Sequence, residues 1–263
     1  MHSRQTRRLD LQPRTDKVPA KALAKVLRFP VRHLAIGIPD CENETDAVCA
    51  TLRFAGVLNK KGQPRERAGR VQIVQTGDLL LKRAPDPAVV RFWQRLGAKV
   101  AQGGGALHLV AGNHEMEIWR RLRAGERFGL SRPDLARLAA HIRSTKLFHL
   151  DGSTLYLHGY PTVAFLRDLE RYCARTGRAP ERYNRDRFAK ALRDPKKLAA
   201  FDYAADGGRG LLHDVSSPRQ YYRRHGKEVA GLLAGFGVAT VVHGHRPERD
   251  GVQTDFELSL IHI

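Results

Sequence analysis

Apolar and β-branched residues gather in short runs along the chain, and four of these runs end in an Asp, Asn or His beside a glycine. Runs of this length and composition predict buried strands. Because parallel strands present their carboxyl ends at one edge of a sheet, these polar residues are expected to lie together. The four segments are Val71–Asp78, Leu107–Glu115, Thr154–Gly159 and Ala239–His245.

Segments with helical spacing of apolar residues separate these strands, which is typical of an α/β fold. Residues 160–235 are mostly helical and highly charged, and we expect them to form a helical cap over the strand ends. The expected helices are Thr45–Ala55 and Asp86–Ala101, with others across residues 115–147; further strands are expected at His33–Ile36, Leu147–Leu150, Val252–Leu258 and Leu260–Ile263.

A length of 263 residues suits one large domain, expected here over residues 31–263. Residues 1–30 are basic and contain Pro13 and Pro19, and they predict a loose N-terminal arm with a short helix at Ala20–Leu27. The chain stops inside an apolar run, Leu260–Ile263, which predicts a C-terminally shortened domain with an exposed sheet edge or, alternatively, a final edge strand.

The chain carries 46 Lys and Arg against 27 Asp and Glu, a formal net charge of +19. This balance favours anionic partners, such as phosphorylated proteins, phosphorylated small molecules or nucleic acid bound nonspecifically. The sequence contains no nucleic-acid-binding motif and only 7% aromatic residues. Nucleic-acid binding is therefore the weaker of these expectations.

The longest apolar stretch, Val229–Val242, is interrupted by glycines and is shorter than the roughly 20 residues that a membrane-spanning helix needs. The N-terminus has no apolar signal core. The three cysteines have no zinc-site spacing and include an unpaired thiol. A cytoplasmic protein with no membrane partner is expected.

Four side chains from the strand ends form a candidate metal site: Asp78, Asn113, His158 and His245. One carboxylate, one amide oxygen and two imidazoles suit a borderline divalent ion such as Mn²⁺, Zn²⁺ or Fe²⁺. Such an ion polarises a phosphoryl oxygen and lowers the pKa of a bound water. His114, next to Asn113, would then protonate the leaving group.

The order of these blocks resembles the calcineurin-like metallophosphoesterases, in particular the serine/threonine phosphoprotein phosphatases and their bacterial, Shewanella-like relatives. The resemblance covers about residues 32–260 and rests on Gly112–Glu115, His158-Gly159 and Gly244-His245. It implies an α/β (α+β) fold, a four-layer sandwich of two mixed β-sheets flanked by helices. It also implies two metals at the strand ends and attack of a metal-bridging hydroxide on a phosphate ester.

By the same resemblance, Asp78 is similar to the carboxylate that bridges both metals, and His114 is similar to the general acid. Asn113, His158 and His245 are similar to the ligands of the second metal. Arg223 lies in the segment where relatives carry a phosphate-binding Arg.

The chain departs from the family pattern in two blocks. The first-metal motif Asp-x-His reads Ile38-Pro39-Asp40, and isoleucine cannot bind a metal. In the second block Leu81 stands where the family has an Asp that orients the catalytic His. Lys82 stands where the family has a phosphate-binding Arg, followed here by Arg83, and a lysine offers phosphate only a point charge.

Two interpretations follow from these departures. In the first, Asp40, aided by Glu42, retains a distorted first-metal site, and the protein hydrolyses phosphate monoesters, phosphoproteins among them, with one or two Mn²⁺ (alternatively Fe or Zn) per chain. In the second, the chain is a catalytically impaired phosphatase fold that binds phosphorylated or nucleic-acid partners. We favour the enzyme, because His114 and every ligand of the second metal are present.

Overall fold

The computed structural model describes residues 34–63, 65, 71–202 and 218–245, together with two short strands at residues 254–255 and 259–262. All of these belong to one unit, residues 33–263. The basic arm and the short helix expected at Ala20–Leu27 lie outside the described residues.

The first sheet contains three strands in the order β1-β2-β3, all parallel. They are β1 (Leu34–Ile38), β2 (Val71–Gln75) and β3 (Ala106–Leu109). β2 is the central strand and is almost entirely buried, as expected for its β-branched run. Parallel pairing brings the carboxyl ends of all three strands to the same edge, where the predicted polar residues follow.

The second sheet contains five strands in the order β4-β5-β6-β8-β7. β4 pairs antiparallel with β5 through the expected hairpin turn, whereas β5, β6 and β8 run parallel and β7 returns antiparallel. The strands are β4 (Phe148–Asp151), β5 (Thr154–Leu157), β6 (Thr240–His243), β7 (Thr254–Asp255) and β8 (Ser259–His262). Of the strand expected at Val252–Leu258, the described part is β7.

The described helices cover both sheets and the carboxyl end of β3. They are α2 (Thr45–Phe54), α3 (Pro87–Gln102), α4 (Asn113–Arg123), α5 (Arg132–Ser144), α6 (Val163–Thr176), the π-helical turn η2 (Asn184–Phe188), α7 (Ala189–Ala191), α8 (Pro195–Asp202) and α9 (Pro218–Gly235). Two of these helices start with a side-chain cap followed by an early proline. Asp86 caps α3 ahead of Pro87, and Ser131 caps α5 two residues ahead of Pro133.

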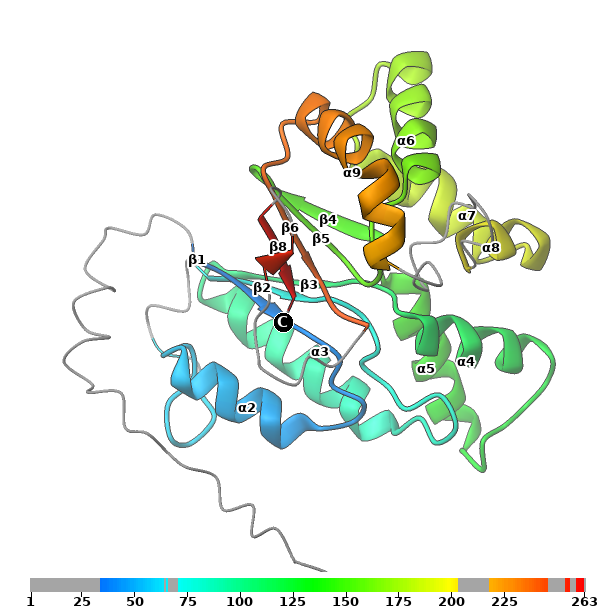
Figure 1. Ribbon diagram of the computed structural model, residues 1–263. Helices are drawn as coiled ribbons and strands as arrows, with labels where there is room; N and C mark the ends of the chain where they lie inside the picture. The colour runs from blue at the N-terminus through cyan, green and yellow to red at the C-terminus, as the bar shows by residue number, and fades with distance from the viewer. Residues whose placement is uncertain are drawn as a thin grey trace, which may run out of the picture. The chain divides into compact units, whose positions relative to one another are not determined.

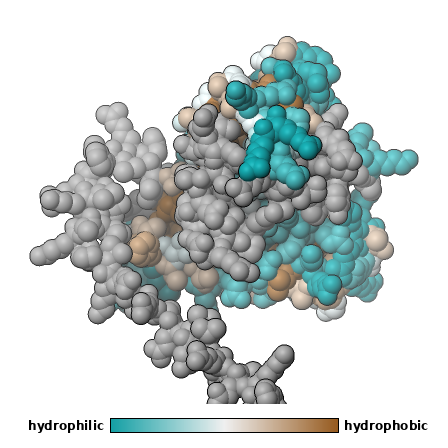
Figure 2. Space-filling model, viewed as in Figure 1, coloured by the Kyte–Doolittle hydropathy of each residue, from teal (hydrophilic) through white to brown (hydrophobic). Residues whose placement is uncertain are grey.

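Figure 1 shows four layers in the described unit: α2 and α3 lie on the outer face of the three-stranded sheet, and α6 and α9 lie on the outer face of the five-stranded sheet. The predicted α/β sandwich is therefore confirmed. Between the sheets, Val74, Val110, Tyr156 and Val242 pack in one apolar cluster. Figure 2 shows that the visible surface over the helices is mainly hydrophilic. In the described part of the chain, no helix combines the length and the apolar character needed to cross a bilayer.

Candidate active site

The carboxyl end of β2 turns sharply through Gly77 and Asp78, whose φ angles are 106° and 50°. The carboxylate of Asp78 is buried, and its Oδ1 accepts the backbone N–H of His114 at 2.8 Å. A Cβ added to Gly112 would meet the backbone N of Asp78 at 2.3 Å and would also overlap its carboxylate. Glycine at position 112 is thus what allows the turn after β3 to lie directly against Asp78.

Glu115 locks these two turns together and was not assigned a role from the sequence. Its Oε2 accepts the backbone N–H groups of Gly112 and Asp78 at 2.8 and 2.9 Å, and its Oε1 accepts that of Leu80 at 3.1 Å. Burial, and then the charge of Asp78, raise the pKa of Glu115 to about 8, and the three N–H groups oppose that rise. Glu three residues after the N-cap Gly112 was the available signal, because this is the capping-box spacing.

The amide and imidazole side chains predicted to bind a metal converge on one point. Asn113 Oδ1 lies 2.8 Å from His158 Nε2 and 2.9 Å from His245 Nδ1, and the two imidazole nitrogens lie 3.0 Å apart. Asp78 Oδ1 is 3.5 Å from the same nitrogen of His158. Asp78, His158 and His245 form one of the candidate metal-binding groups among the described residues.

The hydrogen bonding of this cluster suits a cation. His158 Nδ1 donates to the carbonyl of Thr76 at 3.0 Å, which directs the lone pair of a neutral Nε2 toward Asn113 and His245. With the tautomer of His245 that leaves Nδ1 unprotonated, three electron-donating atoms face one another, and a divalent ion among them would relieve the repulsion of their lone pairs. Metal–nitrogen bonds are about 2.1 Å long, so donors at right angles around one ion lie about 3.0 Å apart. The separations of 2.8 to 3.0 Å match that spacing.

Asp40 contacts the backbone of this cluster. Both of its carboxylate oxygens accept the N–H of His245 at 3.1 Å, and His245 itself has a φ of 80°. Burial raises the pKa of Asp40, opposed first by the nearby His158. Among the described residues Asp40 is in neither of the candidate metal-binding groups, so its predicted role as a ligand stays a prediction.

Ile38, at the position of the missing first-metal carboxylate, is the last residue of β1 and is buried in the main hydrophobic core. Its carbonyl accepts the backbone N–H of Thr76 at 2.9 Å. The residue therefore has a packing role in the sheet.

A second candidate metal-binding group consists of Glu42, Asp78 and His114, whose ligand atoms lie within 4.8 Å of one another. Asp78 belongs to both groups: its Oδ1 faces His158, and its Oδ2 lies 3.5 Å from His114 Nε2. The carboxylate of Asp78 thus lies between the two predicted functional centres.

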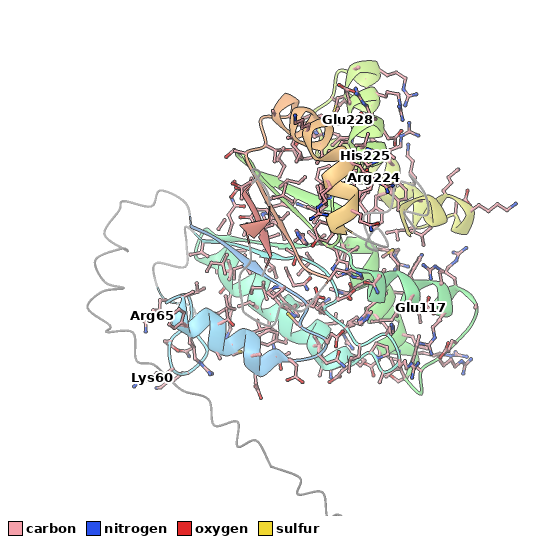
Figure 3. The ribbon with its side chains drawn as sticks, viewed as in Figure 1. Lys60, Arg65, Glu117, Arg224, His225 and Glu228 are labelled. Carbon is pink, nitrogen blue, oxygen red and sulfur yellow. The ribbon has the colours of Figure 1, made fainter. Side chains whose placement is uncertain are left out.

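The predicted phosphate-binding cations lie on the surface. Lys82 and Arg83 are exposed, and the carbonyl of Lys82 accepts a hydrogen bond from Arg121 at 2.7 Å. Arg223 is exposed on α9, the helix along which Figure 3 labels Arg224, His225 and Glu228. Their contact with substrate phosphate stays a prediction.

Helix α9 is tied to the segment that follows His158. The hydroxyl of Tyr222 donates to the carbonyl of Pro161 at 2.7 Å, and the hydroxyl of Tyr221 accepts the N–H of Val163 at 2.8 Å. These bonds attach the part of α9 that carries Arg223 to the segment Pro161–Val163, which follows the predicted metal ligand His158 by only a few residues.

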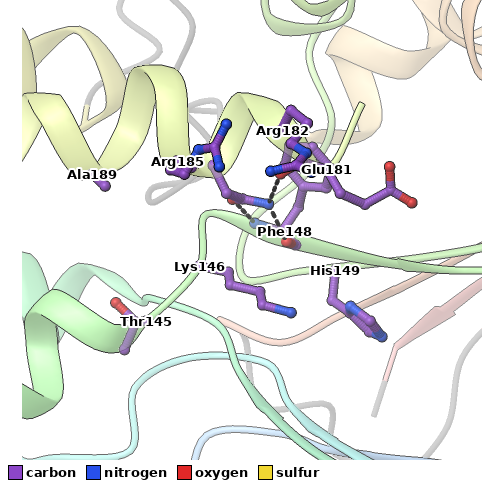
Figure 4. Close-up of a pocket in the computed structure, with 9 residues that line it drawn as sticks. Thr145, Lys146, Phe148, His149, Glu181, Arg182, Arg185 and Ala189 are labelled. Atoms are coloured by element: carbon purple, nitrogen blue, oxygen red, sulfur yellow. Dashed lines mark hydrogen bonds between the residues drawn. The ribbon is translucent and has the colours of Figure 1, made fainter. Parts of the chain in front are cut away.

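A separate cavity of about 330 Å³ lies between the start of β4 and the segment around η2 (Figure 4). None of the predicted site residues lines this cavity. Asn184, at its wall, accepts the N–H of Leu147 at 2.7 Å and donates to the carbonyl of Phe148 at 2.9 Å, and these bonds fix η2 to β4. The cavity is lined by Thr145, Lys146, Phe148, His149, Glu181, Arg182, Asn184, Arg185 and Ala189.

Comparison with known proteins identifies the family and the fold. The sequence model for the calcineurin-like phosphoesterase family matches residues 41–249. A cold-active protein-tyrosine phosphatase of a psychrophilic Shewanella species shares the fold with a TM-score of 0.65 and 19% identity, over 89% of this chain and 72% of that one. A point mutant of a cold-active protein tyrosine phosphatase gives a TM-score of 0.59 with 19% identity and the same coverage. A search of curated proteins found no match.

Proposed function

The chain belongs to the calcineurin-like phosphoesterase family, and from that membership we propose that it hydrolyses phosphate monoesters, including those of phosphoproteins, in a reaction that depends on a divalent cation. The observation that carries the proposal is the convergence of Asn113, His158 and His245, with donor atoms 2.8 to 3.0 Å apart.

Asn113, His158, His245 and Asp78 would hold the cation. Two imidazoles beside two oxygen donors favour Mn²⁺, with Fe²⁺ and Zn²⁺ as alternatives, and Asp78 lies where it could contact a second ion. When bound, such a cation polarises the phosphoryl oxygens and provides a water of lowered pKa as nucleophile. Thr76 supports this role, because its carbonyl fixes the orientation of the His158 ring.

His114 would act as the general acid. Its Nδ1 donates to the carbonyl of Leu80 at 3.0 Å, and its Nε2 lies on the side of the proposed metal site, 3.5 Å from Asp78 Oδ2. The proton on Nε2 would pass to the leaving oxygen as the phosphorus–oxygen bond breaks, and the imidazole would then be neutral. Lys82, Arg83 and Arg223 would contribute positive charge toward the substrate phosphate, in keeping with the chain's net charge of +19.

The proposal is tested by counting Mn²⁺ bound per chain and measuring hydrolysis of phenyl phosphate in parallel. We expect His158→Ala to lose both bound metal and activity. His114→Ala should retain the metal and lose about 100-fold or more in kcat, the usual contribution of a general acid. His225→Ala, which changes a histidine on α9, is the matched control and should resemble wild type.

Equal rates for wild type, His158→Ala and His114→Ala would refute the catalytic proposal. If the three proteins have equal rates and wild type still binds metal and phosphate, the result would instead support a catalytically impaired phosphatase fold that binds phosphorylated partners.

A further inference from the structure

The loop Cys41–Asn43 is fastened onto the turn that carries Asp78. The N–H groups of Cys41 and Glu42 both donate to the carbonyl of Asp78, at 3.1 and 3.0 Å, and the N–H of Asn43 donates to the carbonyl of Leu79 at 3.1 Å. Three successive backbone bonds therefore fix this loop relative to the proposed metal-binding carboxylate.

The backbone of this loop is held in an unfavourable conformation. Glu42 and Asn43 have φ angles of 41° and 76°, and neither is glycine. Asn adopts such a conformation more readily than most residues, whereas Glu rarely does and keeps it only where surrounding contacts enforce it. The side chain of Asn43 supplies such contacts, since it accepts the N–H of Leu81 at 3.3 Å and donates to the carbonyl of Ala84 at 3.1 Å.

The consequence of this geometry is a carboxylate beside the proposed general acid. Glu42 Oε1 lies 3.7 Å from His114 Nδ1, the nitrogen that also donates to the carbonyl of Leu80 at 3.0 Å. The His114 side chain is 9% exposed and the Glu42 side chain 48% exposed, so Glu42 approaches an otherwise buried ring from the solvent side. Leu81, the next residue after Leu80, is an exposed apolar side chain that cannot orient an imidazole.

We propose that Glu42 is the positioning residue for His114: the carboxylate of Glu42 holds the His114 ring in place. This inference rests on the proposed function of His114 as a general acid. The carbonyl of Leu80 fixes which nitrogen bears the internal proton, and Glu42 supplies the negative charge that a carbonyl lacks.

Two substrates whose leaving groups differ in their need for a proton separate a positioning role of Glu42 from a purely structural one. Glu42→Gln should lower kcat roughly 10-fold to 100-fold for phenyl phosphate, whose basic leaving oxygen needs a proton. For dinitrophenyl phosphate, whose leaving group departs without a proton, the loss should be at most about twofold. KM should change little in both cases. Glu44→Gln, the same change at an exposed position two residues away, is the matched control and should leave both rates unchanged.

Two further measurements separate positioning from other roles. Glu42→Gln should bind as many Mn²⁺ ions per chain as wild type, and loss of an ion would overturn the proposal by making Glu42 a metal ligand. In histidine-labelled protein loaded with diamagnetic Zn²⁺, Glu42→Gln should shift the ring nitrogen resonances of His114, identified by their absence in His114→Ala, and Glu44→Gln should not.

Unshifted His114 resonances, or equal losses of kcat for the two esters, would refute the role of Glu42. If wild type hydrolyses neither ester, the proposed function fails, and the resonances still decide whether Glu42 holds the ring.

Discussion

Replacement of Gly112 by alanine is expected to disrupt the site, because the two turns that build it touch at this residue. The added Cβ would lie 2.3 Å from the backbone N of Asp78 and 2.9 Å from its Cγ, where real contacts stay beyond 3.0 Å. The φ of Gly112 is −105°, which alanine adopts freely. Any loss of stability in Gly112→Ala would therefore come from the steric overlap of the added Cβ and not from backbone strain.

The size of the stability loss can be estimated from the groups that the added Cβ would displace. The overlap is with the backbone and the carboxylate of Asp78, and a forced displacement of packed groups costs about 1 to 3 kcal/mol. The displacement also strains the bond from the His114 N–H to Asp78 and the bonds from Gly112 and Asp78 to Glu115. Weakening one bond to a charged acceptor adds about 1.5 to 3 kcal/mol. The free energy of unfolding should thus fall by about 2.5 to 6 kcal/mol, a large part of a typical total of about 5 to 15 kcal/mol.

Urea unfolding in the presence of a chelator measures this change without a contribution from bound metal. Gly231→Ala is the control, because the same substitution there should change the free energy of unfolding in the opposite direction. Gly231 is exposed in α9, and an added Cβ would meet nothing within 4 Å. It should raise the free energy of unfolding by about 0.5 to 1 kcal/mol, because alanine is the better helix former. If Gly112→Ala unfolds within about 0.5 kcal/mol of wild type and binds Mn²⁺ equally well, the close approach to Asp78 is not a constraint on the fold.

Three smaller predictions concern single side chains. Burial lowers the pKa of His141 to about 4, so His141 binds its proton in the unfolded chain before it does so in the folded one as pH falls from about 6.5 to 4. Wild type should therefore lose about 3 kcal/mol of its free energy of unfolding between pH 7 and pH 4 through this residue, and His141→Leu should not. Equal pH dependence of the two proteins in urea unfolding would contradict this. Asp86→Ala removes the acceptor of the Ala88 N–H at the start of α3 and should lower the free energy of unfolding by about 1 kcal/mol, whereas no change in the urea midpoint would exclude a capping role. Metal-free His245→Gly should be about 1 kcal/mol more stable than His245→Ala, because glycine accepts the φ of 80° without strain, and an alanine variant of equal stability would show that this backbone is relaxed.

The strands and most helices were predictable because each is encoded locally, by an apolar run or by a capping residue ahead of a helical pattern. The carboxyl-end location of Asp78, Asn113 and His158 followed from the same logic, since parallel pairing puts those ends together. Glu115 illustrates what was missed: its three backbone partners belong to two different turns, and nothing local to the sequence reveals that these turns touch.

Asp40 shows the limit of a motif for a different reason. The sequence predicts a metal-binding role for its carboxylate, and the fold adds a partner that the motif does not reveal, the N–H of His245, 205 residues away. A Cβ on Gly244 would meet Asp40 Oδ1 at 2.5 Å, so the two segments are in close contact. Local sequence gives the chemistry of such a side chain, whereas its partner depends on how the second sheet packs against the first.

Backbone strain is concentrated around the proposed site. In the part of the chain that the structure describes, five residues other than glycine have positive φ: Glu42, Asn43, Asp78, Phe128 and His245. All but Phe128 surround the proposed metal centre and general acid. Asn, Asp and His adopt positive φ more readily than other residues, so among these four the cost is greatest at Glu42, where it is about 1 to 3 kcal/mol. The side chain of Glu42 also lies beside His114, at 3.7 Å from its Nδ1, and the backbone of Glu42 is held there by the bond from its N–H to the carbonyl of Asp78.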